Sequence, residues 1–262
     1  MNKKLSKTFF FILPFRLLIL IVFLLCPSFS FGQFYNGSQT DFGQNRIQYQ
    51  DFKWNYYKFQ KYEVYYNTGG KELAIYVARC AKLHMADIEK FFDFTIDDKI
   101  QFIVYNKQED FKQSNVGLNT EDGANVGGVT RIVGRKVFLY YKDEHVTLEE
   151  QIRAGIAEVL INQMMYGGNM RDMVKNSTLL NLPEWYTKGL ISYVAKGWSS
   201  ETDNRVRDGI LSSRYRKFNH LTGEDALYAG QSIWYYIGEK YSPSIIHDIV
   251  CSCSPSLAND LR

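Results

Sequence analysis

The side chains that could bind a metal ion or activate a water molecule are few in this sequence. Its 262 residues include only four histidines, and no two of them are close along the chain. The histidines are His84, His145, His220 and His247. Two histidines on a helix bind one metal ion when they are four residues apart, because that spacing places them on the same face. The sequence therefore excludes every compact two-histidine metal motif.

Glu158 is the acidic residue whose surroundings are most informative. It lies in Ile152–Met165, a stretch that is apolar apart from this glutamate, one arginine, one asparagine and one glutamine. Thr147 is a good N-cap with Glu150 at the capping-box position, and two glycines follow Tyr166, so a helix is predicted over residues 147–166. An apolar surface this wide is typical of a central, buried helix. Glu158 then either reaches solvent or an ordinary partner, or is placed for chemistry.

Residues 1–32 have the pattern of a secretory signal peptide. Lysines precede the apolar run Leu17–Cys26, and Ser30 and Gly32 are the small residues before a cleavage site at Gln33. This short run covers only about half of a bilayer core when helical, so an uncleaved anchor over Phe9–Phe31 is the less favoured alternative. No other long apolar run occurs in the sequence, so no transmembrane segment is expected after cleavage. We expect an exported protein that is periplasmic or associated with the outer membrane.

The composition predicts a folded domain and disfavours one class of partner. With 45% hydrophobic and 23% charged residues, the chain can bury a substantial core. The formal charge of +3 comes from residues 1–32, which hold four of the 31 basic residues and no acid, so 27 basic residues face 28 acidic ones after cleavage. A near-neutral chain argues against nucleic-acid binding through phosphate contacts. We predict a flexible lead-in at 33–50, one domain at 51–250 and an irregular tail at 251–262.

The pattern within residues 51–250 changes from strands to helices. Strands are predicted at Tyr62–Tyr66 and Lys99–Tyr105, with a long amphipathic helix at Lys71–Phe92 between them. A hairpin is predicted at Val129–Tyr141, around a turn that contains a glycine. The rest reads as helices at 184–195, 201–212, 222–240 and 243–250. This order predicts an α+β fold, a small mixed or antiparallel sheet followed by a helical half.

This layout resembles the peptidase MA-like domain, a gluzincin-type metallopeptidase domain, in the version found in large bacterial envelope proteins of the TolB-like translocation type. The stretches that carry the resemblance are spread over roughly residues 40–250 and are Gln44–Gly70, Gly127–Tyr141, Leu182–Trp198, Arg205–Ile210 and Tyr228–Tyr241. The resemblance implies a zincin-type architecture. In active members of the family, a central helix carries His-Glu-x-x-His and a later helix carries a glutamate as the third zinc ligand.

When the family's ligand positions are matched to this sequence residue by residue, the resemblance implies a site that lacks the metal ligands. The two histidine positions correspond to Ala157 and Ile161, and the third ligand position corresponds to Lys188. Glu158 matches the general base beside the first histidine. Alanine and isoleucine have no lone pair to donate, and a protonated lysine repels a cation. The resemblance therefore implies neither a zinc cofactor nor a working catalytic residue.

Two hypotheses about binding follow from the resemblance. If the helices keep the family geometry, Lys188 stands near the vacated metal position, where its ammonium group can form an ion pair with Glu158. The hairpin Val129–Tyr141 can also keep a groove that receives an extended peptide by strand addition. The simpler interpretations are an ordinary partner for Glu158 and a purely structural hairpin.

We therefore expect an exported, catalytically inactive metallopeptidase-like domain that serves as a binding or scaffold element in the bacterial cell envelope, with an unidentified protein or peptide partner. One alternative is an active zinc-dependent metallopeptidase with an unconventional ligand set, such as His84 or His145 together with Glu158. Another alternative is a truncated remnant of a larger envelope protein.

Overall fold

The computed structural model describes residues 48–114, 130–133, 135–166 and 182–253. The predicted signal peptide at 1–32 and all but the last three residues of the predicted lead-in at 33–50 lie outside this part of the chain. Of the predicted tail at 251–262, only the first three residues are described. They continue helix α9 (Ser244–Ser252) or cap it, so that helix extends two residues beyond the predicted boundary at 250.

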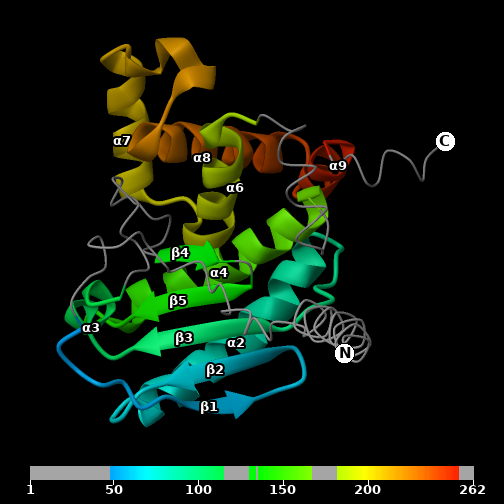
Figure 1. The fold of residues 1–262 in the computed structure, drawn as a ribbon. Coiled ribbons are helices and arrows are strands. Elements are labelled where there is room, and N and C mark those ends of the chain that lie inside the picture. Colours follow the sequence, from blue (N-terminus) through cyan, green and yellow to red (C-terminus); the bar gives the residue numbers. More distant parts are fainter. Residues whose placement is uncertain (1–47, 115–129, 134, 167–181, 254–262) are drawn as a thin grey trace, which may run out of the picture. The chain divides into compact units, whose positions relative to one another are not determined.

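All strands of the described chain lie in its first half, where they form one mixed sheet (Figure 1). Its strands run in the order β1-β2-β3-β5-β4, with β1 and β4 at the edges. The central pairs β2–β3 and β3–β5 are parallel, whereas β1 and β4 are each antiparallel to their neighbours. The strands are β1 (Asn55–Lys58), β2 (Tyr62–Tyr66), β3 (Ile100–Tyr105), β4 (Thr130–Val133) and β5 (Lys136–Tyr140).

Alternate residues of the central strands enter two different clusters, as the two-residue period of a strand requires. The larger cluster includes Phe102 and Val104 of β3 and Leu139 of β5, and it also contains the buried residues of two long helices. The smaller cluster joins Tyr105 and Tyr140 to Phe111 of a short helix. The main core therefore lies between the sheet and the long helices.

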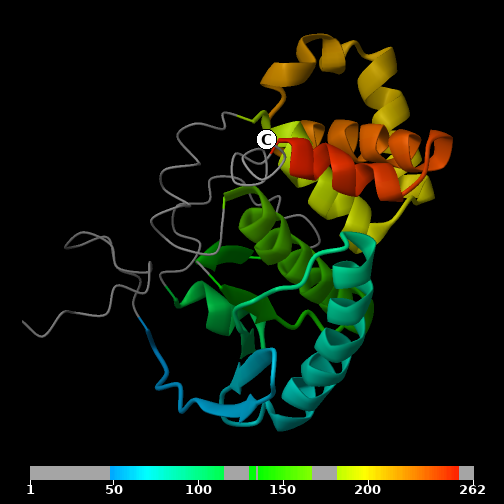
Figure 2. The same ribbon diagram turned by 90° about the vertical axis from the view of Figure 1, so that its right-hand side faces the viewer.

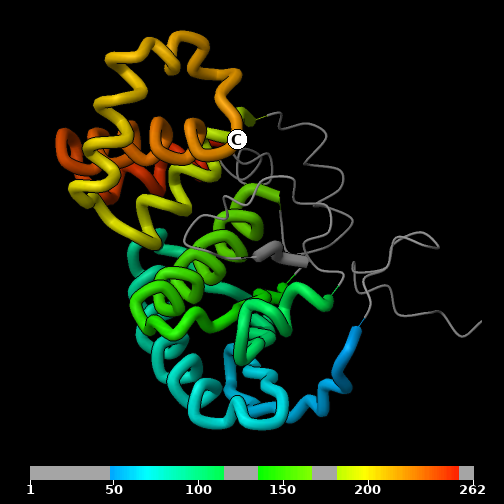
Figure 3. Tube along the Cα trace, turned by 90° about the vertical axis from the view of Figure 1, so that its left-hand side faces the viewer, coloured from blue at the N-terminus to red at the C-terminus, as the bar shows by residue number. Residues whose placement is uncertain are grey.

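The helices of the described chain include two that pack against the sheet and against each other, α2 and α4. Figures 2 and 3 show α2 and α4 side by side. The helices after α4 form the second half, in which α6 packs closely on α8. The helical elements are α2 (Lys71–Phe91), α3 (Gln108–Lys112), α4 (His145–Tyr166), α6 (Glu184–Lys196), α7 (Ser200–Leu211), the 3-10 helix η2 (Arg214–His220), α8 (Gly223–Lys240) and α9 (Ser244–Ser252).

Helix α4 is fixed on the sheet by two residues of one face. A Cβ atom at Gly155 would overlap the side chain of Val137, so the glycine lets the helix approach β5 closely. One turn earlier, the Gln151 side chain forms two hydrogen bonds with the backbone of Tyr140. Its Nε2 donates to the carbonyl oxygen at 3.0 Å, and its Oε1 accepts from the N–H at 3.2 Å. Both contacts set the position of the centre of α4.

Helices α6 and α8 cross with their backbones in contact. A Cβ atom at Gly189 would overlap the backbone of Gly230, and one at Gly230 would overlap the carbonyl group of Trp185. Trp234 of α8 donates a hydrogen bond from Nε1 to the carbonyl oxygen of Tyr186 at 2.9 Å, in a buried position. This close crossing fixes the first turns of α6, where Lys188 lies.

The α+β fold, with a small sheet followed by a helical half, is confirmed, and the sheet is mixed. Two details differ from the sequence prediction. Helix α4 begins at His145, two residues before the predicted cap, and Thr147 donates its hydroxyl hydrogen to the carboxylate of Glu144 instead of capping the helix. Strand β1 was not predicted, because its mostly exposed residues lack the alternation of a half-buried strand. No helix in the described part of the chain is long and apolar enough to cross a membrane.

Candidate functional site

The centre of α4 holds the two positions that the resemblance aligns with histidine ligands. Ala157 and Ile161 are four residues apart and therefore lie on one face of the helix. Their exposed fractions are 0% and 1%, and both belong to the main core together with Leu190 of α6. This face of α4 is therefore filled by apolar packing and offers no lone pair to a metal ion.

Glu158 lies on a different side of α4, the side that faces the sheet. At 100° per residue, Gln151, Gly155 and Glu158 fall within about 60° of one another around the helix axis. The first two contact β5. The next turn carries Glu158 further along this face, and α4 contacts the edge strand β4 as well as β5. Helix geometry therefore places Glu158 on the side of α4 that carries the contacts with β5, and the positive charge of Lys188 on α6 also acts on it.

The carboxyl group of Glu158 is kept largely away from water. Burial raises its pKa from 4.5 to about 7, and the positive charge of Lys188 opposes this rise only partly. Glu158 forms no hydrogen bond or ion pair with any residue that the structure describes. At neutral pH the group therefore exists in both forms, as an acid that can donate a hydrogen bond and as a carboxylate that can accept one.

Lys188 does not make the ion pair with Glu158 that the sequence hypothesis expects. Its Nζ contacts Oε2 of Glu184 at 2.6 Å, one turn earlier on α6. The same oxygen accepts a hydrogen bond from the backbone N–H of Gly223 at 3.1 Å, at the start of α8. A partner four residues away on the same helix requires little additional ordering of the lysine, so it competes well with a partner on another helix. The lysine acts on Glu158 only through space.

The histidines of the alternative ligand set do not meet Glu158. His84 on α2 contacts Oε1 of Glu149 through Nε2 at 2.9 Å, which links α2 to α4. His145 packs against the rings of Tyr76 and Tyr141. The described residues contain no group of three or more histidine, cysteine, aspartate or glutamate side chains that could hold a metal ion.

One contact between reactive side chains was missed in the sequence. Nε2 of His247 lies 3.3 Å from Sγ of Cys251, one turn later on α9, and Nδ1 donates a hydrogen bond to the carbonyl oxygen of Phe92. The spacing of four residues was a usable signal for this pair. Burial, together with the negative charges of Asp248 and Asp93, raises the pKa of the Cys251 thiol. The thiol therefore stays protonated at neutral pH and is a poor nucleophile.

The predicted hairpin is present as β4 and β5, and its outer strand has a single neighbour in the described sheet. The register shifts between Thr130 and Ile132, so β4 carries a bulge opposite β5. The first residue of the predicted hairpin, Val129, lies outside the described residues. Comparisons with models of known protein families, with curated proteins and with solved structures found no match.

Proposed function

We propose that this chain is an exported, non-catalytic binding domain of gluzincin-like architecture that takes an extended segment of an envelope protein or peptide along its edge strand β4. The observation that carries the proposal is the combination of a strand that has a partner on one side only within the described sheet and an adjacent helix whose potential ligand positions are apolar. Helix α4 contacts β4, and Ala157 and Ile161 are buried in the core.

The edge strand supports the proposal through its backbone. Within the described sheet β4 pairs only with β5, so half of its backbone N–H and C=O groups point away from the sheet. An extended peptide satisfies such groups when it adds as a further strand, and its affinity then comes largely from main-chain hydrogen bonds. This mode of binding requires neither a metal ion nor a nucleophile.

Glu158 supports the proposal as a polar group on the side of α4 that carries the contacts with β5. Its pKa of about 7 makes both protonation states accessible under ordinary conditions. The ionised form can accept a hydrogen bond from a peptide N–H, and the protonated form can donate one to a peptide carbonyl. We assign Glu158 the role of orienting the bound segment, in place of the general-base role that it has in the family's zinc site.

Peptide binding is tested by measuring fluorescence anisotropy of a labelled extended chain, reduced and carboxymethylated α-lactalbumin, as the purified protein is added. Ile132→Pro and Val133→Pro are compared, because successive residues of a strand direct their N–H groups to opposite edges. The variant whose N–H points outward should fold normally and bind at least about tenfold more weakly, since one missing main-chain hydrogen bond and the proline ring disturb strand addition.

The matched control is a pair of proline substitutions on the other edge strand, β1, at Tyr56→Pro and Tyr57→Pro. The variant of this pair that loses an outward-pointing N–H group should leave peptide binding unchanged. Equal binding by both β4 variants and the parent chain would contradict the proposal. Cleavage of the labelled chain that disappears in Glu158→Gln would replace it with an active peptidase.

The gluzincin-like architecture is tested separately by restoring the ligand set. The triple variant Ala157→His, Ile161→His and Lys188→Glu should take up one zinc ion per chain, and zinc should raise its unfolding temperature. Elemental analysis and thermal unfolding with and without a chelator make the measurement, with the double variant that keeps Lys188 as the control. A triple variant that folds and still takes up no zinc would show that α4 and α6 are not arranged as in the family.

A further inference from the structure

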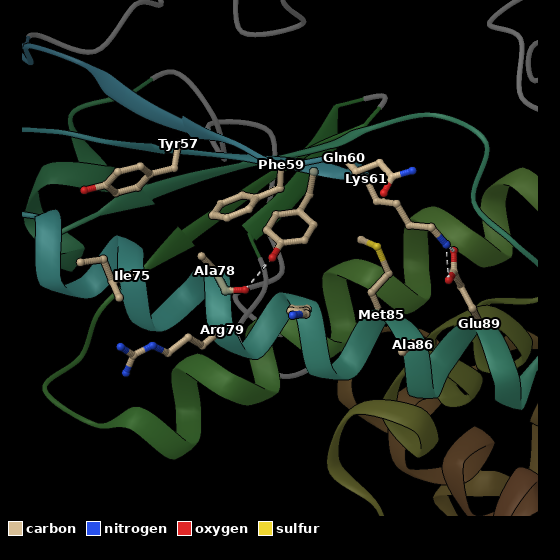
Figure 4. A pocket seen from close by; sticks show the side chains of 12 residues that line it. Tyr57, Phe59, Gln60, Lys61, Ile75, Ala78, Arg79, Met85, Ala86 and Glu89 are labelled. Atoms are coloured by element: carbon tan, nitrogen blue, oxygen red, sulfur yellow. Dashed lines mark hydrogen bonds and ion pairs between the residues drawn. The ribbon is translucent and has the colours of Figure 1, made fainter.

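A groove lies between the β1–β2 hairpin and helix α2, and it plays no part in the site described above. Its volume is about 760 Å³, within the usual range for small-molecule sites. Figure 4 shows the hairpin side chains above α2, with the space between them. The groove is lined by Tyr57, Phe59, Gln60, Lys61, Tyr62, Ile75, Ala78, Arg79, Lys82, Met85, Ala86 and Glu89.

The two walls of the groove are apolar. One wall is aromatic, where the rings of Phe59 and Tyr62 stack with their centroids 4.8 Å apart. Tyr62 donates its hydroxyl hydrogen to the carbonyl oxygen of Ala78 at 2.8 Å, which holds this wall at a fixed distance from α2. The other wall is the α2 face that carries Ile75, Ala78 and Met85 at helical spacing. The walls are therefore held in place without a ligand.

The charges of the groove are unequal. Its single lining acid, Glu89, is already satisfied, because its two oxygens accept from Nζ of Lys61 at 2.8 and 2.6 Å and one of them also accepts from the N–H of Ile96 at 3.0 Å. Arg79 and Lys82 are exposed on α2 and make no ion pair or hydrogen bond with any residue in the described ranges. Two cations beside an apolar groove fit a ligand with an apolar body and an anionic end.

We propose that this groove binds a long-chain carboxylate. Its acyl chain lies between the aromatic wall and α2, and its carboxylate lies at the mouth, where Arg79 and Lys82 can reach it. The lining offers few groups that could form hydrogen bonds with a polar ring of a ligand, since Gln60 is its one side-chain amide. A flexible acyl chain needs no such partners and gains affinity from burial alone, by about fourfold for each buried methylene. The proposal does not depend on peptide binding at β4.

The test is a titration of the purified protein with cis-parinarate, whose fluorescence rises in an apolar site, followed by competition. Palmitate should displace the probe more effectively than laurate, and laurate more effectively than octanoate. Methyl palmitate should displace it at least about tenfold more weakly than palmitate, because it lacks the charge that the two cations attract.

The double variant Arg79→Gln/Lys82→Gln should bind cis-parinarate at least about tenfold more weakly. The matched control Lys71→Gln/Lys90→Gln removes the same charge from exposed positions of the same helix outside the groove and should bind as the parent does. Ala86→Trp, at an exposed helix position, should fill the groove and abolish binding. Circular dichroism and thermal unfolding establish that each variant is folded.

Absence of parinarate binding, equal competition by the methyl ester, or unchanged binding by Arg79→Gln/Lys82→Gln would each overturn the proposal. Displacement by AMP at concentrations where palmitate has no effect would assign the groove to a nucleotide instead. Capture of the protein by phosphatidylglycerol vesicles that is lost in the same double variant, without binding of free palmitate, would assign the two cations to a membrane surface.

Discussion

The carboxylates of Glu89 on α2 and Glu158 on α4 are both partly enclosed by protein, yet they have opposite surroundings. Glu89 accepts hydrogen bonds from Lys61 and from a backbone N–H. Glu158 has no such partner among the described residues, and burial raises its pKa to about 7. The difference comes from the lysines: Lys61 reaches across to Glu89, whereas Lys188 is held by Glu184 on its own helix. A nearby cation therefore satisfies a buried acid only when its own neighbours leave it available.

The helical half that holds Lys188 and the α2 side of the sheet also differ in how tightly they are packed. The α6–α8 crossing, which holds the first turns of α6, leaves no space for a single added methyl group at Gly189. The α2 side of the molecule has a groove of about 760 Å³. Space for a ligand therefore exists at the hairpin and α2, whereas the α4 positions that the resemblance aligns with a metal site are filled with core side chains.

The largest expected change in the free energy of unfolding comes from enlarging a side chain at the α6–α8 crossing, compared with the same kind of change beside the groove. Gly189→Ala should lower the free energy of unfolding by about 3 kcal/mol, because the new methyl group overlaps backbone atoms that cannot move independently. Ala86→Leu, at an exposed position beside the groove, should change it by less than about 0.5 kcal/mol. Urea denaturation measures both. Equal effects would remove the contrast between a tight crossing and an open groove.

A smaller effect should distinguish the two acids. A group whose folded pKa lies above its unfolded value stabilises the folded state below the unfolded pKa, and this contribution is lost as the pH rises through the folded pKa. For Glu158 that window runs from 4.5 to about 7. Glu158→Gln should therefore stabilise the protein by about 2 kcal/mol at pH 8, allowing for partial exposure, and by almost nothing at pH 4.

Glu89→Gln is the matched control for this prediction, and its effect at pH 8 should have the opposite sign, a loss of about 1 kcal/mol, because it removes the ion pair with Lys61 and one of the two oxygens that accept from it. Glu184→Gln adds a second control with the smallest effect. It releases Lys188, which should lower the pKa of Glu158 and move the pH window downward. Chemical denaturation across pH 4–9 measures all three variants, and a pH-independent effect of Glu158→Gln would show that its carboxyl group is well solvated.

Much of the fold could be predicted because the relevant signals are local. Strand β2 occupies the predicted residues, and α2 ends within one residue of its predicted end, since a change of hydrophobic period and flanking glycines define both. The 3-10 helix at Arg214–His220 was not predicted, because none of its residues is fully buried and its two partly buried aromatic residues are too few to show a helical pattern. Patterning therefore identifies the elements with several fully buried residues and misses short elements whose side chains are at most partly buried.

The candidate site was less predictable, because which acid pairs with a lysine depends on all the acids that the fold brings near it. The sequence contained Glu184 four residues before Lys188, and this local pair was a stronger expectation than the long-range pair with Glu158. The groove left a weaker signal. Arg79 and Lys82 look like the solvated face of an amphipathic helix, and only the folded structure shows that they line a groove together with aromatic side chains of the hairpin.

The hydrogen bonds between Gln151 and Tyr140 join residues only eleven positions apart. Closing so short a segment costs little chain entropy, whereas the parallel contact of β2 with β3, as between Glu63 and Gln101, spans 38 positions. We therefore expect β5 and α4 to associate early as the chain folds and to provide the surface on which the more distant strands are then assembled.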